Sequence, residues 1–366
     1  MAVDARFADY IARVDEHSPV ADRGSEGLAP TPLREKLLEL VALGGTDFGL
    51  SNSREPIAAQ AALIGALAEK CLSTAFVTWS HRMTTEYIDR FATGDFRAKY
   101  LPELLAGARV GSTALATALA DKSGKELLPI TFTETKDESG ASAYAISGVI
   151  PWASNLYDDT LVAFAARNET TEERVIFAAV LGDHKGVTVK PAADLLALNA
   201  TASGTVRFDG LALTDANVLT RDVNLFLGQM RPRFLVLQAS FCLGLVRASL
   251  TATAGANGLA PFAADVEDFT AELERLSAEL ERLAATLETY PAPGNGHAPL
   301  EFLKLRLGAA ELAQAVSRVE LATVGGRGYY SASATSRRIR ESLFLSVQAP
   351  TEGSLRWEIS QLTSAA

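Results

Sequence analysis

The sequence predicts an α+β protein of three domains. These are an N-terminal helical domain (residues 1–108), a middle antiparallel β-barrel domain (residues 109–217) and a C-terminal four-helix bundle (residues 218–366). Apolar residues recur at helical spacing near both ends of the chain, whereas the middle holds short apolar or alternating runs separated by turn residues. With 366 residues, 48% of them hydrophobic, the chain is long enough for two or three separate cores.

The first domain is expected to consist of helices. Residues 5–14 are amphipathic, and residues 32–43 form a helical pattern with a proline near its start and a pair of glycines at its end. Residues 57–75 are rich in Ala and Leu with few charges, which is typical of a helix buried between neighbours. A shorter helix is predicted over residues 96–106.

The middle domain is expected to be a sheet. Its strands should follow one another without intervening helices, so the sequence favours an antiparallel sheet or a small barrel. The predicted strands cover residues 127–134, 144–150, 160–166, 174–181, 186–191 and 203–213.

The last domain is expected to be a bundle of long helices. Residues 231–254 are almost all apolar or small, which predicts a deeply buried helix. Residues 269–287 place Phe and Leu at alternating spacings of four and three, a heptad pattern suited to packing against a long helix or another subunit. A helix over residues 300–324 should end at the glycines that begin with Gly325.

Composition excludes several functional classes. Cys71 and Cys242 lie far apart without a second ligand nearby, so neither a disulfide framework nor a metal site is predicted. Uninterrupted apolar runs are shorter than the roughly 18 residues of a membrane span, and the charged N-terminus is unlike a signal peptide. We therefore expect a cytoplasmic protein. A net charge of −10 argues against general nucleic-acid binding.

His81 is one candidate for chemistry. It could act as a metal ligand or as an acid–base group, but no second ligand stands three or four residues away. The favoured interpretation is a buried helix histidine with a hydrogen-bonding partner.

Residues 146–155 are the most informative stretch of the sheet. They read as a strand that turns at Gly148 and ends with Pro151, Trp152, Ala153 and Ser154. An indole followed by small polar residues at a strand end suits a planar ligand, which it can meet ring against ring beside a hydroxyl. The alternative is a core tryptophan followed by a turn.

The order helix, sheet, helix, together with six short motifs, resembles the acyl-CoA dehydrogenase family over nearly the whole chain. Each motif alone is weak, but all six occur in the family's order on matching predicted elements. The motifs lie at residues 100–107, 146–155, 198–211, 230–232, 325–329 and 351–354.

The resemblance implies a flavoprotein that binds FAD and dehydrogenates an acyl thioester between its α and β carbons. Glu352 would be the base that removes the α-proton while hydride leaves the β-carbon for flavin N5. Arg231 matches an arginine near the catalytic carboxylate. Glu352 could instead be a surface residue at a helix start, and Arg231 could form a helix-start ion pair.

The resemblance also implies which residues contact the cofactor. Trp152 would pack against the flavin, and Ser154 would offer its hydroxyl or N–H near N5. Gly325 and Gly326 would allow close backbone approach to the FAD of a neighbouring subunit. Two further cofactor contacts, after the glutamate, would come from Ser354 and Arg356.

Two departures from the family pattern concern the cofactor. The threonine that bonds the flavin pyrimidine is replaced by Ala116, so Thr117 is the substitute candidate. The family's Arg-x-x-Phe-Gly is replaced by residues 254–262, which contain no cation. The pyrophosphate end of FAD therefore loses an expected partner, and FMN or a substrate other than a CoA ester stays open.

Three functional interpretations follow. The first is an acyl-CoA dehydrogenase-like oxidoreductase, for which an electron-transfer flavoprotein is one candidate partner. The second is a flavin-dependent monooxygenase on the same fold, and the third is a non-catalytic subunit that uses the fold for assembly. The family and the heptad pattern imply a homodimer or homotetramer.

Overall fold

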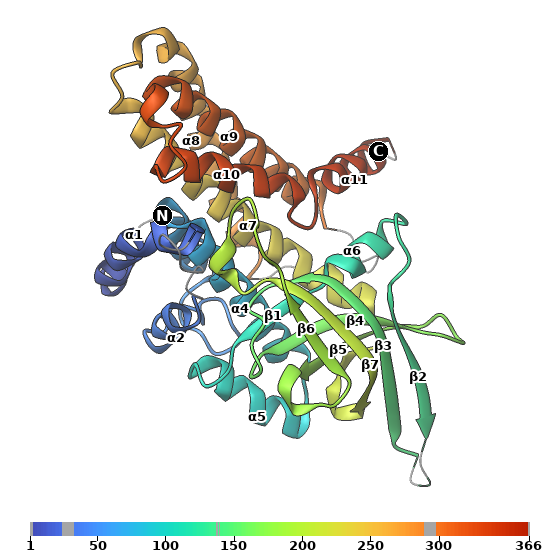
Figure 1. The fold of residues 1–366 in the computed structure, drawn as a ribbon. Coiled ribbons are helices and arrows are strands. Elements are labelled where there is room, and N and C mark those ends of the chain that lie inside the picture. Colours follow the sequence, from blue (N-terminus) through green and yellow to red (C-terminus); the bar gives the residue numbers. More distant parts are fainter. Residues whose placement is uncertain (1–2, 24–32, 137, 139, 289–297, 365–366) are drawn as a thin grey trace.

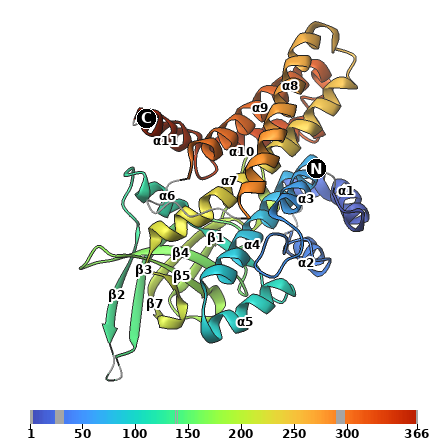
Figure 2. The ribbon, with the colours of Figure 1, turned by 180° about the vertical axis from the view of Figure 1, so that it is seen from behind.

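The computed structural model describes residues 3–23, 33–136, 138, 140–288 and 298–364 (Figure 1). Helices come first, a sheet domain follows, and helices close the chain, as predicted. A pair of long helices projects away from the sheet domain in both views (Figures 1 and 2).

The N-terminal part is helical as predicted, with one break that the sequence did not indicate. The expected helix over residues 57–75 is interrupted at Cys71, whose backbone is extended (φ −158°, ψ 111°). A new helix begins at the next residue, and 18 of its 20 residues are buried. The α-helices of this part, among the residues described, are α1 (Ala8–Arg23), α2 (Arg34–Ala42), α3 (Ile57–Lys70), α4 (Leu72–Phe91) and α5 (Gly94–Leu105).

The middle domain is an open sheet and not a closed barrel, which corrects the prediction. Its strands run in the order β6-β7-β3-β2-β4-β5-β8, and β1 pairs with β4. The edge strands β6 and β8 do not pair with each other in the described residues. The strands are β1 (Gly111–Ala114), β2 (Ile130–Lys136), β3 (Ser142–Ala153), β4 (Leu161–Asn168), β5 (Arg174–Val180), β6 (Val187–Pro191), β7 (Gly204–Thr214) and β8 (Val218–Thr220).

The sheet is also mixed and not purely antiparallel. Both β1 and β2 run parallel to β4. A helix that the sequence did not indicate, α6 (Ala116–Lys122), lies between β1 and β2 in the chain. All six predicted strands are present within a few residues of their expected bounds.

Strand β3 is longer than predicted because it passes through Pro151 and Trp152 to Ala153. Its pairing with β7 shifts register twice, between Ile146 and Gly148 and between Ile150 and Ala153. At the first shift Gly148 has φ +131°, and a Cβ there would lie 2.3 Å from the Pro129 carbonyl oxygen. Such bulges bend a strand and commonly re-aim a side chain, and here they lie in the part of β3 that leads to Trp152.

The C-terminal part is helical as predicted, with five α-helices in the described residues. Helix α7 begins eight residues earlier than predicted, and Pro232 lies inside it. The heptad leucines of α8 pack against α7 and α9 of the same chain. The helices are α7 (Val223–Ala254), α8 (Ala263–Thr286), α9 (Leu300–Val324), α10 (Ala334–Val347) and α11 (Glu352–Ser364).

Helix α7 is the one described helix long and apolar enough to cross a membrane. Its most apolar window is 78% buried inside the protein, so packing accounts for its composition. Figure 2 shows α7 and α4 beside the sheet, where the three parts of the chain meet. This junction positions the candidate site.

Candidate active site

A cavity of about 710 Å³ lies where the helical parts meet the end of β3. Its volume is within the roughly 300–1,000 Å³ typical of small-molecule sites. Most of its wall is apolar, and Arg340 is the one charged residue among the described lining residues. The lining comes from α4 (Phe76, Trp79, Ser80), β1 and α6 (Thr113, Leu115, Ala116), β3 (Pro151, Trp152, Ala153, Ser154), the loop before β7 (Leu195, Leu196, Ala197, Leu198, Thr201, Ser203), α7 (Phe234) and the α10 region (Arg340, Leu343, Phe344, Val347, Gln348, Ala349).

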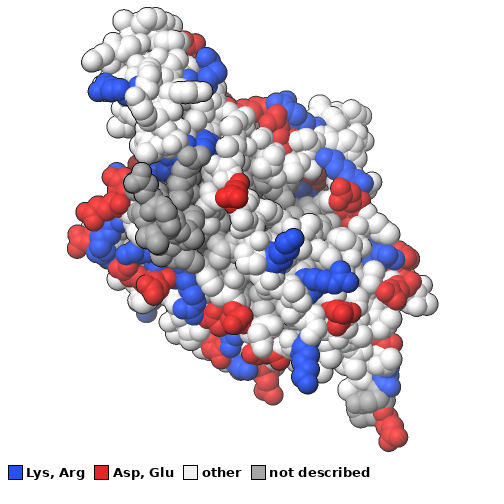
Figure 3. Space-filling model, viewed as in Figure 1, with Lys and Arg blue, Asp and Glu red and all other residues white. Residues whose placement is uncertain are grey.

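The cavity has an exposed side and a buried side. Trp152 is 40% exposed, and Leu196 and Val347 are more exposed still. On the opposite wall, Trp79 and Phe234 are buried. Acidic and basic side chains are intermingled over the face shown in Figure 3, and the centre of that face is largely uncharged. Large apolar side chains left in water around a cavity indicate that a ligand or a partner covers them.

A chain of hydroxyl groups ends at Ser154. The Thr201 hydroxyl donates to the Leu198 carbonyl oxygen at 2.7 Å, so it can only accept from Ser203, whose oxygen lies 2.7 Å away. Ser203 must then accept from Ser154 at 3.0 Å. The Ser154 oxygen keeps a free lone pair, because its own proton is used. It is therefore suited to accept a hydrogen bond from an N–H of a ligand.

The loop that carries this chain is held in an unusual conformation. Asn155, Leu198 and Ala202 are non-glycine residues with positive φ. The Asn155 N–H donates to the Thr201 carbonyl oxygen at 2.9 Å, which joins the end of β3 to the loop. Positive φ at such residues costs free energy and is concentrated at functional sites.

The residues present fit a flavin ring. Trp152 offers an indole beside the Ser154 hydroxyl, and apolar side chains form the surrounding wall. Beside the lining residue Ala116, Thr117 is 8% exposed, and its buried hydroxyl has no partner in the described residues. A buried hydroxyl without a partner is costly, so this atom is suited to a polar ligand group. The structure thus brings Trp152 and Ser154 to one cavity, and Thr117 directly follows its lining residue Ala116.

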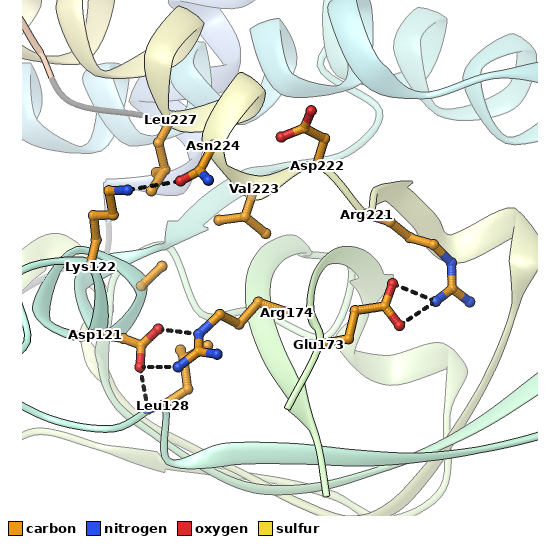
Figure 4. A pocket seen from close by; sticks show the side chains of 11 residues that line it. Asp121, Lys122, Leu128, Glu173, Arg174, Arg221, Asp222, Val223, Asn224 and Leu227 are labelled. Atoms are coloured by element: carbon orange, nitrogen blue, oxygen red, sulfur yellow. Dashed lines mark hydrogen bonds and ion pairs between the residues drawn. The ribbon is translucent and has the colours of Figure 1, made fainter. Parts of the chain in front are cut away.

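A second cavity, of about 650 Å³, lies between α6, β5 and the start of α7 (Figure 4). Arg174 is paired with Asp121, with a shortest N–O distance of 2.6 Å, and Arg221 bonds both oxygens of Glu173 at 2.9 Å. Carboxylates therefore already neutralise these two arginines. A phosphate group would have to compete with these carboxylates for the guanidinium donors.

Lys122 differs from the other cations of this second cavity. Its ammonium donates to the Asn224 side-chain oxygen at 2.8 Å (Figure 4). Burial, followed by the nearby charge of Arg231, lowers the pKa of Lys122. Lys122 is thus the cation of this cavity best placed to meet a ligand anion.

Glu352, the predicted base, does not line the cavity that contains Trp152. It is the first residue of α11, its side chain is 32% exposed, and it accepts from the Arg356 guanidinium at 2.9 Å. Arg356 also bonds Glu311 on α9, in the same exposed network. In this arrangement the Glu352 carboxylate faces a cation and water, and Val347, Gln348 and Ala349 are the cavity residues nearest to it in sequence.

The other predicted residues of the C-terminal part are also dispersed. Arg231 is buried and bonds both oxygens of Glu358 at 2.6 Å, so its carboxylate partner is not Glu352. Ser354 accepts from the Lys125 ammonium at 2.9 Å. Gly325 and Gly326 line a separate surface hollow with Leu321, Tyr329 and Tyr330.

His81 is a structural residue, as favoured from the sequence. It is fully buried, and its Nδ1 accepts from the Gly111 N–H at 3.0 Å. Burial, together with the neighbouring Arg82, lowers the pKa of His81 to about 4. The imidazole is therefore neutral at ordinary pH, with its proton on Nε2.

The cavity also has an aromatic wall that the sequence did not indicate. Phe76 and Trp79 stack with ring centroids 5.5 Å apart, and Phe234 meets Trp79 edge to face at 4.6 Å. Phe344 contacts Phe76 at 5.1 Å. Phe76 and Trp79 stand three residues apart on α4, a spacing that could have marked one helix face.

Comparison with solved structures identifies the architecture. Butyryl-CoA dehydrogenase from Megasphaera elsdenii superposes with a TM-score of 0.80 at 16% identity, covering 99% of each chain. TdsC from Paenibacillus sp. A11-2, in complex with FMN and indole, gives a TM-score of 0.78 at 17% identity over 96% of each chain. PigA, in complex with FAD, gives 0.78 at 15% identity, covering 100% of this chain and 99% of PigA.

This chain has the acyl-CoA dehydrogenase fold. The resemblance noted in the sequence is thereby confirmed at the level of fold. No protein-family model matches the sequence, and no curated protein matches it. At such identities the acyl-CoA dehydrogenase fold is shared while residue roles are not carried over, so function has to be argued from the site.

Proposed function

We propose that this protein is a flavin-dependent oxidoreductase that binds its flavin in the cavity of Trp152 and Ser154. The observation that carries the proposal is the combination of an exposed indole and an accepting hydroxyl in one largely apolar cavity. The buried, unpartnered hydroxyl of Thr117, which follows the lining residue Ala116, adds to it. Solved structures of the same fold with FAD and with FMN support it. FAD is the proposed cofactor, and FMN is the alternative.

A bound flavin would supply hydride and electron transfer, and the chain would supply its environment. Trp152 would cover one face of the ring. Ser154 would accept a hydrogen bond from a ring N–H, because its own proton is held by Ser203. The apolar wall would exclude water, which strengthens electrostatic interactions inside the site.

For the reaction we propose α,β-dehydrogenation of an acyl thioester, with Glu352 as the base. Arg231 is the proposed arginine near the base, and it would have to leave Glu358 to take that role. The sequence resemblance and the fold shared with butyryl-CoA dehydrogenase support this reaction. It requires Glu352 to leave Arg356 and turn toward the cavity when substrate binds. The paired cations of the second cavity do not favour a CoA phosphate, so the carrier of the acyl group is left open.

A second candidate is a monooxygenase-type reaction of the reduced flavin with oxygen. One observation favours it: none of the described residues lining the cavity is Asp or Glu. A reaction that starts by removing an α-proton needs a base within hydrogen-bond reach, whereas oxygen activation by reduced flavin does not.

The two candidates are separated by one anaerobic experiment. The purified protein is loaded with FAD, and its visible absorption is followed during titration with a panel of acyl-CoA esters. Bleaching by one ester supports dehydrogenation, whereas bleaching only by added reductant, followed by substrate-dependent oxygen uptake, supports the second candidate. Protein that takes up neither FAD nor FMN contradicts both and points to a non-catalytic subunit.

The variant Glu352→Gln tests the base separately. If Glu352 removes the proton, the rate of flavin reduction falls by about 10²–10⁴-fold while the flavin stays bound. Glu311→Gln, in the same exposed network, is the matched control and should leave the rate within about threefold. An unchanged rate in Glu352→Gln removes this residue from the mechanism.

For the assembly we propose a homodimer or homotetramer, with an electron-transfer flavoprotein as a candidate redox partner and a cytoplasmic location. Tyr329 and Tyr330 are 80% and 74% exposed. They lie beside Gly325 and Gly326, where an added Cβ would meet nothing within 4 Å. Such an open apolar surface is suited to a second copy of the chain.

A further inference from the structure

The buried wall of the cavity contains an unsatisfied hydrogen-bond donor. The indole Nε1 of Trp79 is buried and has no hydrogen-bonding partner in the part of the chain that the structure describes. Trp79 is only 3% exposed, yet it lines the cavity. Buried indole N–H groups usually find a partner, because leaving one unpaired costs free energy. This donor therefore lacks an acceptor that a bound molecule could supply.

The surroundings of Trp79 restrict which molecule that could be. Phe76, Phe234 and Phe344 line the same wall and contact one another or Trp79 ring to ring. Their faces are weak acceptors for an N–H and do not replace an oxygen. Rings packed edge to face or stacked favour another flat ring over a flexible alkyl chain.

A second polar group on this wall, the Ser80 hydroxyl, also has a proton without an acceptor among the described residues. The Ser80 hydroxyl accepts from the Thr113 N–H at 3.3 Å, and the described residues provide no acceptor for its own proton. Ser80 also lines the cavity, one residue after Trp79. Both polar groups on this wall therefore offer a donor, and an acceptor oxygen on the ligand complements them.

We propose that Trp79 is a specificity-determining residue, whose N–H holds an acceptor oxygen on a flat, aromatic substrate. This inference rests on the proposed function, because it names the class of substrate for the same cavity. Trp152 on the exposed side would meet the flavin, and the wall of Trp79 would meet the far end of the substrate. An aliphatic acyl chain would leave the indole N–H unsatisfied and is disfavoured.

Two nearly identical probes test the proposal. Acetophenone carries a carbonyl oxygen, whereas α-methylstyrene has a methylene group in its place and the same arrangement of non-hydrogen atoms. Dissociation constants are measured by calorimetry on the full-length protein loaded with FAD. Wild-type protein is expected to bind acetophenone about 5- to 20-fold more tightly than α-methylstyrene, as for one hydrogen bond to a buried donor.

The variant Trp79→Phe assigns this preference to one residue. It keeps an aromatic ring but removes the N–H, so both probes should bind within about twofold of each other and α-methylstyrene should bind as it does to wild type. That retained affinity shows that the variant is folded. Trp357→Phe, on α11 outside the cavity, is the matched control and should keep the wild-type preference.

Three outcomes overturn the proposal: no preference in wild type, an undiminished preference in Trp79→Phe, or no binding of either probe. Flavin uptake is read from the visible spectrum of the same samples. A Trp79-dependent preference in protein that takes up no flavin contradicts the proposed function alone. Bound flavin without a preference contradicts the role of Trp79 alone.

Discussion

At the scale of single residues, two tryptophans with nearly the same exposure should differ in their effect on FAD binding. Trp152 is 40% exposed on the cavity and Trp357 is 39% exposed on α11. Trp152→Ala should weaken FAD binding at least about tenfold, because it removes both a stacking partner and apolar area. Trp357→Ala should leave it within about twofold. Fluorescence titration with FAD measures the dissociation constant of each variant. Equal changes in the two variants would show that Trp152 does not contact the flavin.

The lowered pKa of His81 should make the stability of the fold depend on pH. Its pKa in the folded protein is about 4, below the usual 6.5, so the unfolded chain binds more protons between these values. The stabilisation is complete above the unfolded pKa and is lost as the pH falls from about 6.5 toward 4. Between about pH 7.5 and about pH 5, the free energy of unfolding should fall roughly 2 kcal/mol more in wild type than in His81→Gln. If urea titrations show that wild type and His81→Gln lose the same free energy of unfolding over this pH range, His81 is not the group responsible.

The sequence indicated some site residues and not others, for a physical reason. Trp152 and Ser154 stand out because an indole and small polar residues end a strand, which is unusual for a core position. Trp79 lies in an apolar helix, where its spacing from Phe76 is equally typical of core packing. The position of Glu352 outside the cavity depends on how α11 docks, and no local pattern determines that.

At the scale of elements, the crossing of α3 and α7 depends on two glycines. A Cβ at Gly244 would lie 2.2 Å from the Gly65 carbonyl oxygen, so the two backbones are in contact there. Gly244→Ala should lower the free energy of unfolding by about 1–3 kcal/mol through overpacking, although alanine favours helix. Gly308→Ala on α9 is the control, since its Cβ would lie at an ordinary 3.5 Å from Leu276 and should be neutral or stabilising by up to about 1 kcal/mol. A Gly244→Ala protein as stable as wild type would contradict this packing.

Helices and strands were predictable where a repeating apolar pattern is long. The six predicted strands and the helix ending at Val324 are confirmed. The break at Cys71 was not predictable, because no helix-breaking residue marks it. Strand β1 is only four residues long, and its parallel pairing with β4 is a long-range choice that local sequence does not encode. The mixed character of the sheet comes from that pairing and from the parallel pairing of β2 with β4.

At the scale of the whole molecule, the exposed tyrosines predict self-association. Sedimentation velocity should show a dimer or tetramer for wild type, and Tyr329→Ser with Tyr330→Ser should shift it toward monomer by removing apolar contact area. Leu127→Ser is the control, because Leu127 is also exposed, at 56%, but lies far away in sequence in the loop before β2. A double variant that sediments like wild type would place the interface elsewhere.

The order of helix, sheet and helix was predictable from the sequence, and the fold comparison confirms it. The cavity was not, because it combines residues from α4, β3, α7 and α10, which are far apart in the sequence. Its chemistry therefore rests on tertiary packing.

The most direct test of the proposed function is a crystal structure of the protein loaded with FAD. We predict electron density for the flavin ring against the indole of Trp152, with a ring N–H donating to the Ser154 hydroxyl. A flavin bound elsewhere, or a cavity that stays free of it at saturating FAD, would contradict the account.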